Sequence, residues 1–155
     1  MKRFLSLLAL IWLACLTTPI LALENHSAVA AESHVALVKS VSGDVQVTRA
    51  HRTFKASSGT TLQVSDQVVT AAGATAAIVF RDGTLLTLGS GADILVHDYV
   101  FEPKDSKFSF ALYLAKGSAI YESGKIGKLS PQSVKVSTPK ATVGVRGTRF
   151  LIEAN

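Results

Sequence analysis

The feature that most constrains the fold is the alternation of apolar and polar residues between glycine-containing turns. Phe108, Phe110, Leu112 and Leu114 alternate with smaller or polar residues, and in an extended chain this spacing places one set of side chains on one face of a sheet. After residue 34, no apolar spacing favours a helix. Short strands joined by Gly-rich turns predict an all-β domain, either a sandwich or a twisted solenoid-like stack.

Three segments predict more specific features. The continuous apolar run 76–80 is typical of a strand buried on both faces. Asp82-Gly83 predicts a hairpin with a type I′ turn, because that turn needs positive φ. Five residues of odd number are expected to share one face of an extended stretch: Val35, Leu37, Val41, Val45 and Val47.

The N-terminus is typical of a secretory signal. Lys2 and Arg3 precede an uncharged apolar run over residues 4–16, and small residues predict cleavage after Ala22 or Ala30. We therefore expect a signal peptide over residues 1–30, a short tether over 31–34 and a β-domain over 35–155, in a chain long enough for one domain. The alternative is an uncleaved inner-membrane anchor, since about 20 apolar residues can span a bilayer, and membrane contact is expected only in that case.

The single cysteine and the net charge limit the reactions and the partners that are expected of this chain. Cys15 is the only cysteine, and its context favours an ordinary residue of the signal segment over a lipoprotein acylation site. A cleaved chain would have no thiol for a disulfide, a nucleophile or a metal ligand. Residues 1–30 hold two of the sixteen basic and one of the eleven acidic residues, which leaves fourteen against ten. An exported basic protein of this kind is expected to meet anionic envelope components, not nucleic acid.

The residue patterns do not predict an enzyme, a cofactor or a metal site. The histidines form no HExxH motif or closely spaced pair. His97-Asp98 is interpreted as a turn pair and not a catalytic dyad, because adjacent residues on a strand point to opposite faces. Gly89-Ser90-Gly91 lacks the following helix that a nucleotide-binding fingerprint requires.

The C-terminal stretch changes parity. Val143 and Val145 have odd numbers, whereas Phe150 and Ile152 have even ones, so a bulge or tight turn is expected between Val145 and Phe150. Gly147 is the residue that can adopt the required backbone. On this interpretation Gly144 and Gly147 are structural, and Arg146 and Arg149 pair at the kink or project into solvent.

Several motifs in order resemble the FecR domain family. They are Thr138-Pro139-Lys140-Ala141 with residues 143–150, preceded by the turn motifs at 42–45, 66–70, 82–86 and 115–118. The resemblance covers nearly all of residues 38–152. It implies structural motif roles for seven residues: Thr138, Pro139, Gly144, Arg146, Gly147, Thr148 and Phe150. Ser65 stands where the family usually has glycine, which suggests a slightly different turn.

The best-known members of this family are inner-membrane regulators that relay occupancy of an outer-membrane iron transporter to a cytoplasmic sigma factor. They have a cytoplasmic segment before the membrane span and further periplasmic sequence after the domain. Here three residues precede the apolar segment and the sequence given ends at Asn155. The resemblance therefore implies a stand-alone exported FecR domain, located in the periplasm.

Two functions remain open. The first is a non-catalytic protein-interaction, sensory or scaffold module of the cell envelope, whose partner is an envelope protein. The alternative is binding of an anionic envelope polymer or lipid headgroups, with Arg146 assisting the basic side chains of the C-terminal half. Those side chains are Lys116, Lys125, Lys128, Lys135, Lys140 and Arg149.

Overall fold

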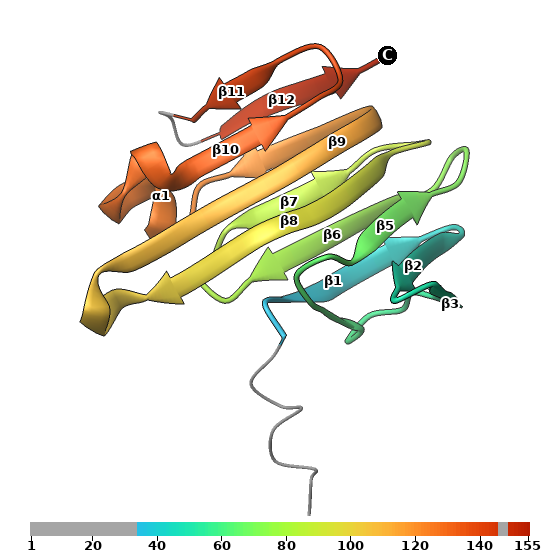
Figure 1. Ribbon diagram of the computed structural model, residues 1–155. Helices are drawn as coiled ribbons and strands as arrows, with labels where there is room; N and C mark the ends of the chain where they lie inside the picture. The colour runs from blue at the N-terminus through green and yellow to red at the C-terminus, as the bar shows by residue number, and fades with distance from the viewer. Residues whose placement is uncertain (1–33, 146–148) are drawn as a thin grey trace, which may run out of the picture.

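The computed structural model describes residues 34–145 and 149–155, which form a single all-β domain (Figure 1). The predicted signal segment, with Cys15 and both cleavage sites, lies outside these residues and stays a prediction. The strands are β1 (Ala36–Ser42), β2 (Val45–Arg49), β3 (Arg52–Lys55), β4 (Thr61–Leu62), β5 (Gln67–Thr70), β6 (Thr75–Phe80), β7 (Leu85–Leu88), β8 (Asp93–Glu102), β9 (Lys107–Glu122), β10 (Val134–Ser137), β11 (Thr142–Gly144) and β12 (Arg149–Ala154).

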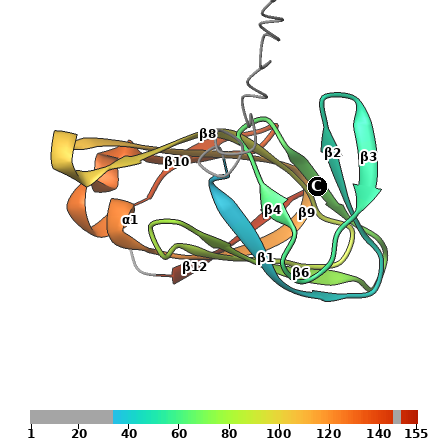
Figure 2. The same ribbon diagram turned by 90° about the horizontal axis from the view of Figure 1, so that it is seen from below.

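The strands form one curled sheet that folds over itself into two layers (Figure 2). The first layer runs β4-β1-β6-β7-β9-β12, and the second runs β3-β2-β5-β8-β9-β10-β11. Strand β9 belongs to both. All pairs of neighbouring strands are antiparallel except β9 and β10, which run parallel to each other. The prediction of an all-β domain is confirmed.

The long strand β9 changes layers at Gly117. Before it, β9 pairs with β8 and β10, and from Gly117 onward it pairs with β7 and β12. Inward residues have even numbers before the crossing, as at Leu114, and odd numbers after it, as at Tyr121. Gly117 has φ +84°, and an added Cβ would lie 2.6 Å from Ala92 Cα. The glycine read as turn chemistry is thus a kink within one strand.

The predicted common face of five odd-numbered residues is wrong. In β1 the buried residues are Ala36 and Val38, and Leu37 is 38% exposed. A bulge follows Val38, and the chain then turns to reach β2 in the other layer. Val45 and Val47 are buried there, so the inward parity of each strand is set by its own layer.

The predictions for the apolar run 76–80 and for the Asp82-Gly83 hairpin also need correction. Strand β6 alternates between buried and half-buried residues, so its apolar run is not buried on both faces. The hairpin between β6 and β7 is confirmed. Because Phe80 N donates to the Thr84 carbonyl at 2.9 Å, its loop is residues 81–83. Gly83 donates to the Phe80 carbonyl at 2.9 Å and has φ +84°, whereas Asp82 does not have positive φ. This geometry is a type I turn followed by a left-handed glycine, not a type I′ turn.

The core lies between the two layers and includes a chain of aromatic rings. Phe80, Tyr99 and Phe110 contact one another with ring centroids 4.8–5.9 Å apart, and Tyr121 links Phe110 to Phe150. One end of the core is closed by α1 (Lys125–Leu129), whose Ile126 is fully buried.

Short helical turns occur where the sequence predicted only loops. Besides α1 there are two 3-10 turns, η2 (Pro103–Asp105) and η3 (Pro131–Ser133). One buried side chain per turn is too weak a signal for sequence periodicity to detect. Within the described residues we find no helix with the length and hydropathy needed to cross a bilayer.

Candidate functional site

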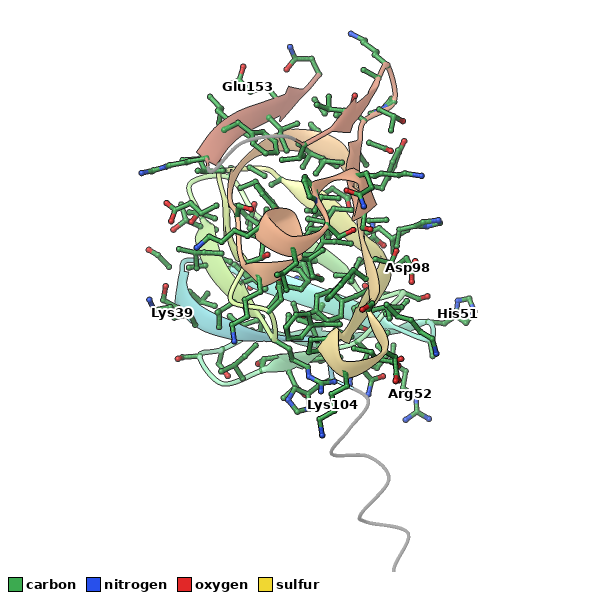
Figure 3. The ribbon with its side chains drawn as sticks, turned by 90° about the vertical axis from the view of Figure 1, so that its left-hand side faces the viewer. Lys39, His51, Arg52, Asp98, Lys104 and Glu153 are labelled. Atoms are coloured by element: carbon green, nitrogen blue, oxygen red, sulfur yellow. The ribbon has the colours of Figure 1, made fainter. Side chains whose placement is uncertain are left out.

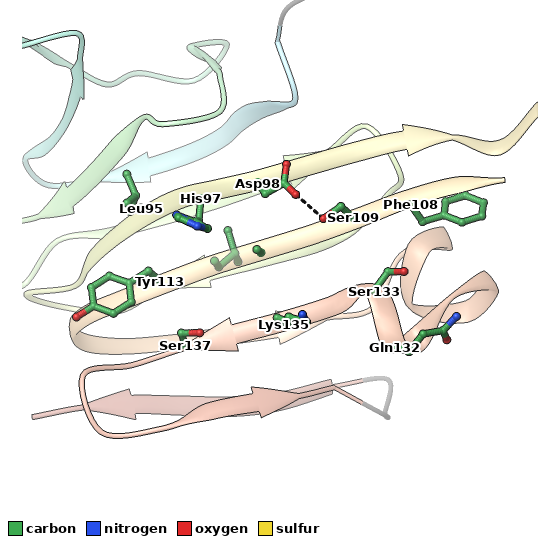
Figure 4. Close-up of a pocket in the computed structure, with 12 residues that line it drawn as sticks. Leu95, His97, Asp98, Phe108, Ser109, Tyr113, Gln132, Ser133, Lys135 and Ser137 are labelled. Carbon is green, nitrogen blue, oxygen red and sulfur yellow. Dashed lines mark hydrogen bonds between the residues drawn. The ribbon is translucent and has the colours of Figure 1, made fainter. Parts of the chain in front are cut away.

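A groove of about 910 Å³ crosses the outer face of β8, β9 and β10 in the second layer (Figure 4). Its polar lining consists mainly of side chains from these three strands and from η3. Six lining side chains on the three strands carry hydrogen-bonding or charged groups: His97, Asp98, Ser109, Tyr113, Lys135 and Ser137.

The alternation of the strands places these side chains outward. Phe110 and Leu112 of β9 are buried, so Ser109 and Tyr113 point away from the core. On β10, Val134 and Val136 are buried and Lys135 and Ser137 face outward. Parallel pairing of β10 with β9 sets Ser137 opposite Tyr113. The groove is therefore built on rigid strands.

A bulge in β8 brings His97 and Asp98 to the same side. The register with β9 shifts between Val96 and Asp98, and both Val96 and Tyr99 are buried although they are three residues apart. The interpretation of His97-Asp98 as a turn pair whose side chains point to opposite faces is therefore wrong, because both residues lie within β8 and the bulge adds a residue to the outer face. Both side chains line the groove.

The polar groups of the groove do not form a catalytic relay. Ser109 Oγ donates directly to Asp98 Oδ2 at 2.6 Å, and the imidazole of His97 has no hydrogen-bond partner within the described part of the chain. A Ser–His–Asp relay would need the imidazole between the hydroxyl and the carboxylate. Residues 34–145 and 149–155 also contain no group of three His, Cys, Asp or Glu side chains placed to hold a metal ion.

The groove nevertheless has the composition of a binding site for another molecule. Tyr113, Leu95 and Phe108 offer apolar surface, and hydroxyl, imidazole and ammonium groups lie beside them. Apolar surface with a few fixed polar groups is the composition of protein binding sites, in which Tyr is enriched. No sequence motif marks this site. The available signal was the outward parity of Ser109, Tyr113 and Ser137.

The predicted C-terminal motif residues lie apart from the groove floor. Thr138–Ala141 closes the β10–β11 hairpin, in which Thr138 N donates to the Ala141 carbonyl at 2.7 Å and Thr138 Oγ1 accepts from Ala141 N at 3.2 Å. Pro139 lies within this turn, where no ladder hydrogen bond needs its nitrogen. Arg146, Gly147 and Thr148 lie outside the described residues.

Two further motif residues differ in their surroundings. Phe150 faces inward and packs against Tyr121, with tilted rings whose centroids are 5.0 Å apart. Gly144 ends β11 without positive φ, and an added Cβ there would meet no atom within 4 Å. Phe150 therefore has a packing role. At position 144 the structure shows no steric reason why the residue must be glycine.

The six predicted anion contacts do not gather on one surface. Lys125 and Lys128 lie on α1, before β10, and Lys140 lies in the turn after β10. Lys116 lies beyond Tyr113 toward the same end as Lys140. Only Lys135 lines the groove, and Arg149 is 3.3 Å from Glu122.

The motif at 82–86 forms a buried polar network. Asp82 is 1% exposed, and its carboxylate accepts from Thr84 Oγ1 at 2.7 Å and from Ile126 N at 3.1 Å. Tyr99 Oη accepts from Asp82 N at 2.8 Å. Burial, and next the charge of Asp82, raise the pKa of Tyr99 well above its usual range. This motif fastens the β6–β7 loop to β8 and α1.

The described residues thus form an all-β domain with a polar network in its core and a groove on one sheet face. The sequence model of the FecR protein family matches residues 66–155, more than half of the chain, and the chain belongs to this family. Membership indicates a regulatory or sensory domain related to the cell envelope, in a family that is not enzymatic. Neither curated proteins nor solved structures gave a match.

Proposed function

We propose that the chain is an exported, non-catalytic module of the bacterial cell envelope that binds a protein partner, and that the groove across β8, β9 and β10 receives this partner. The observation that carries the proposal is the groove itself. Its lining comes mainly from outward positions on three paired strands, while Asp82, Thr84 and Leu86 of the motif at 82–86 are buried. Binding surface and structural motif therefore use different residues.

The chemistry of the groove favours a polypeptide ligand. Tyr113 supplies an amphipathic ring of the kind enriched at protein interfaces. Lys135 and His97 can donate to backbone carbonyls or carboxylates, and Ser137 can donate or accept. A rigid strand platform lowers the entropy cost of ordering these side chains on binding.

Export is part of the proposal. The basic n-region and apolar run at residues 2–16 support it. Fractionation of cells would test it: the processed chain should appear in the periplasmic fraction with residues 1–22 or 1–30 removed. An intact N-terminus in the inner-membrane fraction would favour the anchored alternative.

Site-specific crosslinking tests the groove. A photoreactive residue in place of Tyr113 or Ser137 should yield one discrete protein adduct in intact cells. The matched control is Thr87, which faces outward on β7 in the other layer, and should give no such adduct. Equal adducts from Thr87 and Tyr113 would exclude the groove as the specific site.

A salt series separates the two ligand classes. Salt is added before irradiation, so that it acts on non-covalent binding. Formation of the protein adduct should persist as salt rises, because one exposed lysine and hydrogen bonds make a small contribution from screened charge. A smeared, heterogeneous adduct whose formation decreases with added salt would instead favour an anionic polymer. Lys135→Glu should then abolish capture, whereas it should weaken a protein complex only partly.

A further inference from the structure

In the part of the chain that the structure describes, the curled sheet has four edge strands, and one of them lacks the usual protection against pairing. The edges are β4 and β12 in the first layer and β3 and β11 in the second. An edge strand exposes unpaired backbone N–H and C=O groups, and soluble proteins blunt such edges with short strands, bulges, proline or lysine.

Three of the edges are blunted in these ways. Strand β4 has two residues and β11 has three. Strand β3 carries exposed Arg52 and Lys55 along its four residues. By contrast, β12 has six residues, contains neither proline nor lysine, and pairs with β9 without a bulge. Its two charges, Arg149 and Glu153, are opposite in sign, whereas both charges on β3 are positive. Its central outward residue, Leu151, is 60% exposed.

The charges along β12 are self-complementary. The outward residues are Arg149, Leu151 and Glu153, and the inward ones are Phe150, Ile152 and Ala154. When two copies of this strand run antiparallel about Leu151, each Arg149 faces Glu153 of the other copy on the outer side. Opposite charges directly across two strands stabilise the pairing, whereas like charges oppose it.

We propose that β12 is a homodimerisation edge that pairs antiparallel with β12 of a second copy, with the two Leu151 residues opposite each other. The first layers of the two copies then form one continuous sheet. This contact is isologous and closes, as is usual for soluble homodimers. Glu153 of β12 lies at the margin of the molecule, at the opposite end from Lys104 (Figure 3). It makes no ion pair within the described residues.

The ion pair already present in β12 fits this arrangement. Arg149 Nε lies 3.3 Å from Glu122 Oε1 on β9, its cross-strand neighbour. Pairing with a second copy would place Glu153 on the other side of Arg149. Acidic and basic side chains then alternate across three strands on the outer face, with no like charges adjacent.

Other registers are less favourable. A slip of one residue would set the inward row of one copy opposite the outward row of the other, so Ile152 would leave the core side. A slip of two residues would keep the faces but set Arg149 opposite Leu151 or Asn155 and remove both Arg–Glu pairs. The register centred on Leu151 is the one that keeps both features.

Two lysine substitutions test the edge at matched positions. Leu151→Lys sets two ammonium groups opposite each other at the centre of the pair. Leu129→Lys is the control, because Leu129 is 61% exposed on α1 and outside β12. Sedimentation of the protein as processed by cells should show dimers for the wild type and for Leu129→Lys. We expect a dissociation constant at least about tenfold higher for Leu151→Lys, since like charges directly opposite oppose pairing.

Disulfide crosslinking tests the register. In a Cys15→Ser background, Leu151→Cys should give a dimer under mild oxidation, because directly opposed residues in an antiparallel pair have Cα atoms about 4.5–5.5 Å apart, within disulfide range. Leu129→Cys should stay uncrosslinked. A wild type that stays monomeric throughout, or equal crosslinking at the two positions, would overturn the proposal. The groove lies on the other layer, so neither result depends on partner binding there.

Discussion

Arg49 binds Asp66 through two parallel hydrogen bonds, from Nε to Oδ1 at 2.9 Å and from Nη2 to Oδ2 at 2.6 Å. Asp66 is fully buried, and its carboxylate also accepts from Gln63 N at 2.8 Å. Arg49 Nη2 reaches the Thr61 carbonyl as well. One guanidinium thus fastens the end of β2 to the turn before β5, in the motif at 66–70 that the sequence analysis identified by resemblance alone.

The first prediction concerns this pair. Arg49→Ala should lower the free energy of unfolding by about 3–5 kcal/mol, because it leaves the buried Asp66 carboxylate without its charged partner. Arg49→Lys should cost less, since it keeps the charge and loses the bidentate geometry. Chemical denaturation measures both. Arg52→Ala, at the exposed cross-strand neighbour of Arg49, is the control and should change stability by less than about 0.5 kcal/mol.

The second prediction concerns alkaline pH and Tyr99. The pKa of Tyr99 is raised in the fold, first by burial and then by the charge of Asp82, whereas an unfolded tyrosine releases its proton near pH 10. Above about pH 10 the folded chain therefore binds more protons than the unfolded chain, and stability falls as pH rises. Below that pH, the phenol adds no pH dependence.

Tyr99→Phe should reduce this alkaline slope by up to about 1.4 kcal/mol per pH unit. The same variant should be about 1–3 kcal/mol less stable at pH 7, because the buried Asp82 N–H loses its acceptor. Denaturation series from pH 7 to about pH 11 separate the two effects. An alkaline slope equal to that of the wild type would contradict the role given to Tyr99.

The third prediction concerns Ser65, which has φ +72°. The departure from the family glycine thus keeps a left-handed turn and places a Cβ in it, which is unfavourable by about 1–2 kcal/mol. Ser65→Gly should raise the unfolding free energy by roughly 0.5–1 kcal/mol after the entropy cost of glycine is included. Ser40→Gly in β1, where φ is not positive, should lower it by a similar amount. A destabilised Ser65→Gly would mean that the serine side chain matters more than the backbone.

The fourth prediction concerns the layer crossing at Gly117. Gly117→Val should destabilise the domain by about 3 kcal/mol or more, because it combines positive φ with a Cβ that overlaps Ala92 and the Gly91 carbonyl oxygen. Gly144→Ala has free space and no positive φ, and should stay within about 0.5 kcal/mol of the wild type. Equal effects in thermal unfolding would show that the crossing does not depend on this glycine.

The alternation in the sequence was sufficient for the all-β class and for several strands. It placed Phe110, Leu112 and Leu114 inward correctly and found the β6–β7 hairpin. The same alternation places Ser109 and Tyr113 on the outward face, although these residues were not recognised as part of a site. The bulge or turn expected between Val145 and Phe150 includes residues 146–148, which lie outside the described residues, so it stays a prediction. Val143 and Val145 do not share a buried face, because Val143 is exposed and Val145 is buried.

The tertiary structure alone decided which residue is a turn and which is a kink. Gly117 looks like the turn glycines at 83 and 91 in sequence, yet it lies within one strand because β7, β8 and β12 pair with β9 on either side of it. The bulge that brings His97 and Asp98 together, and the pairing of Arg49 with Asp66, likewise depend on neighbours distant in sequence. Alternation records which side of its own strand a residue faces, because that property is local to the backbone. Register, layer crossing and ion pairing depend on contacts between strands, and a single strand's pattern does not contain them.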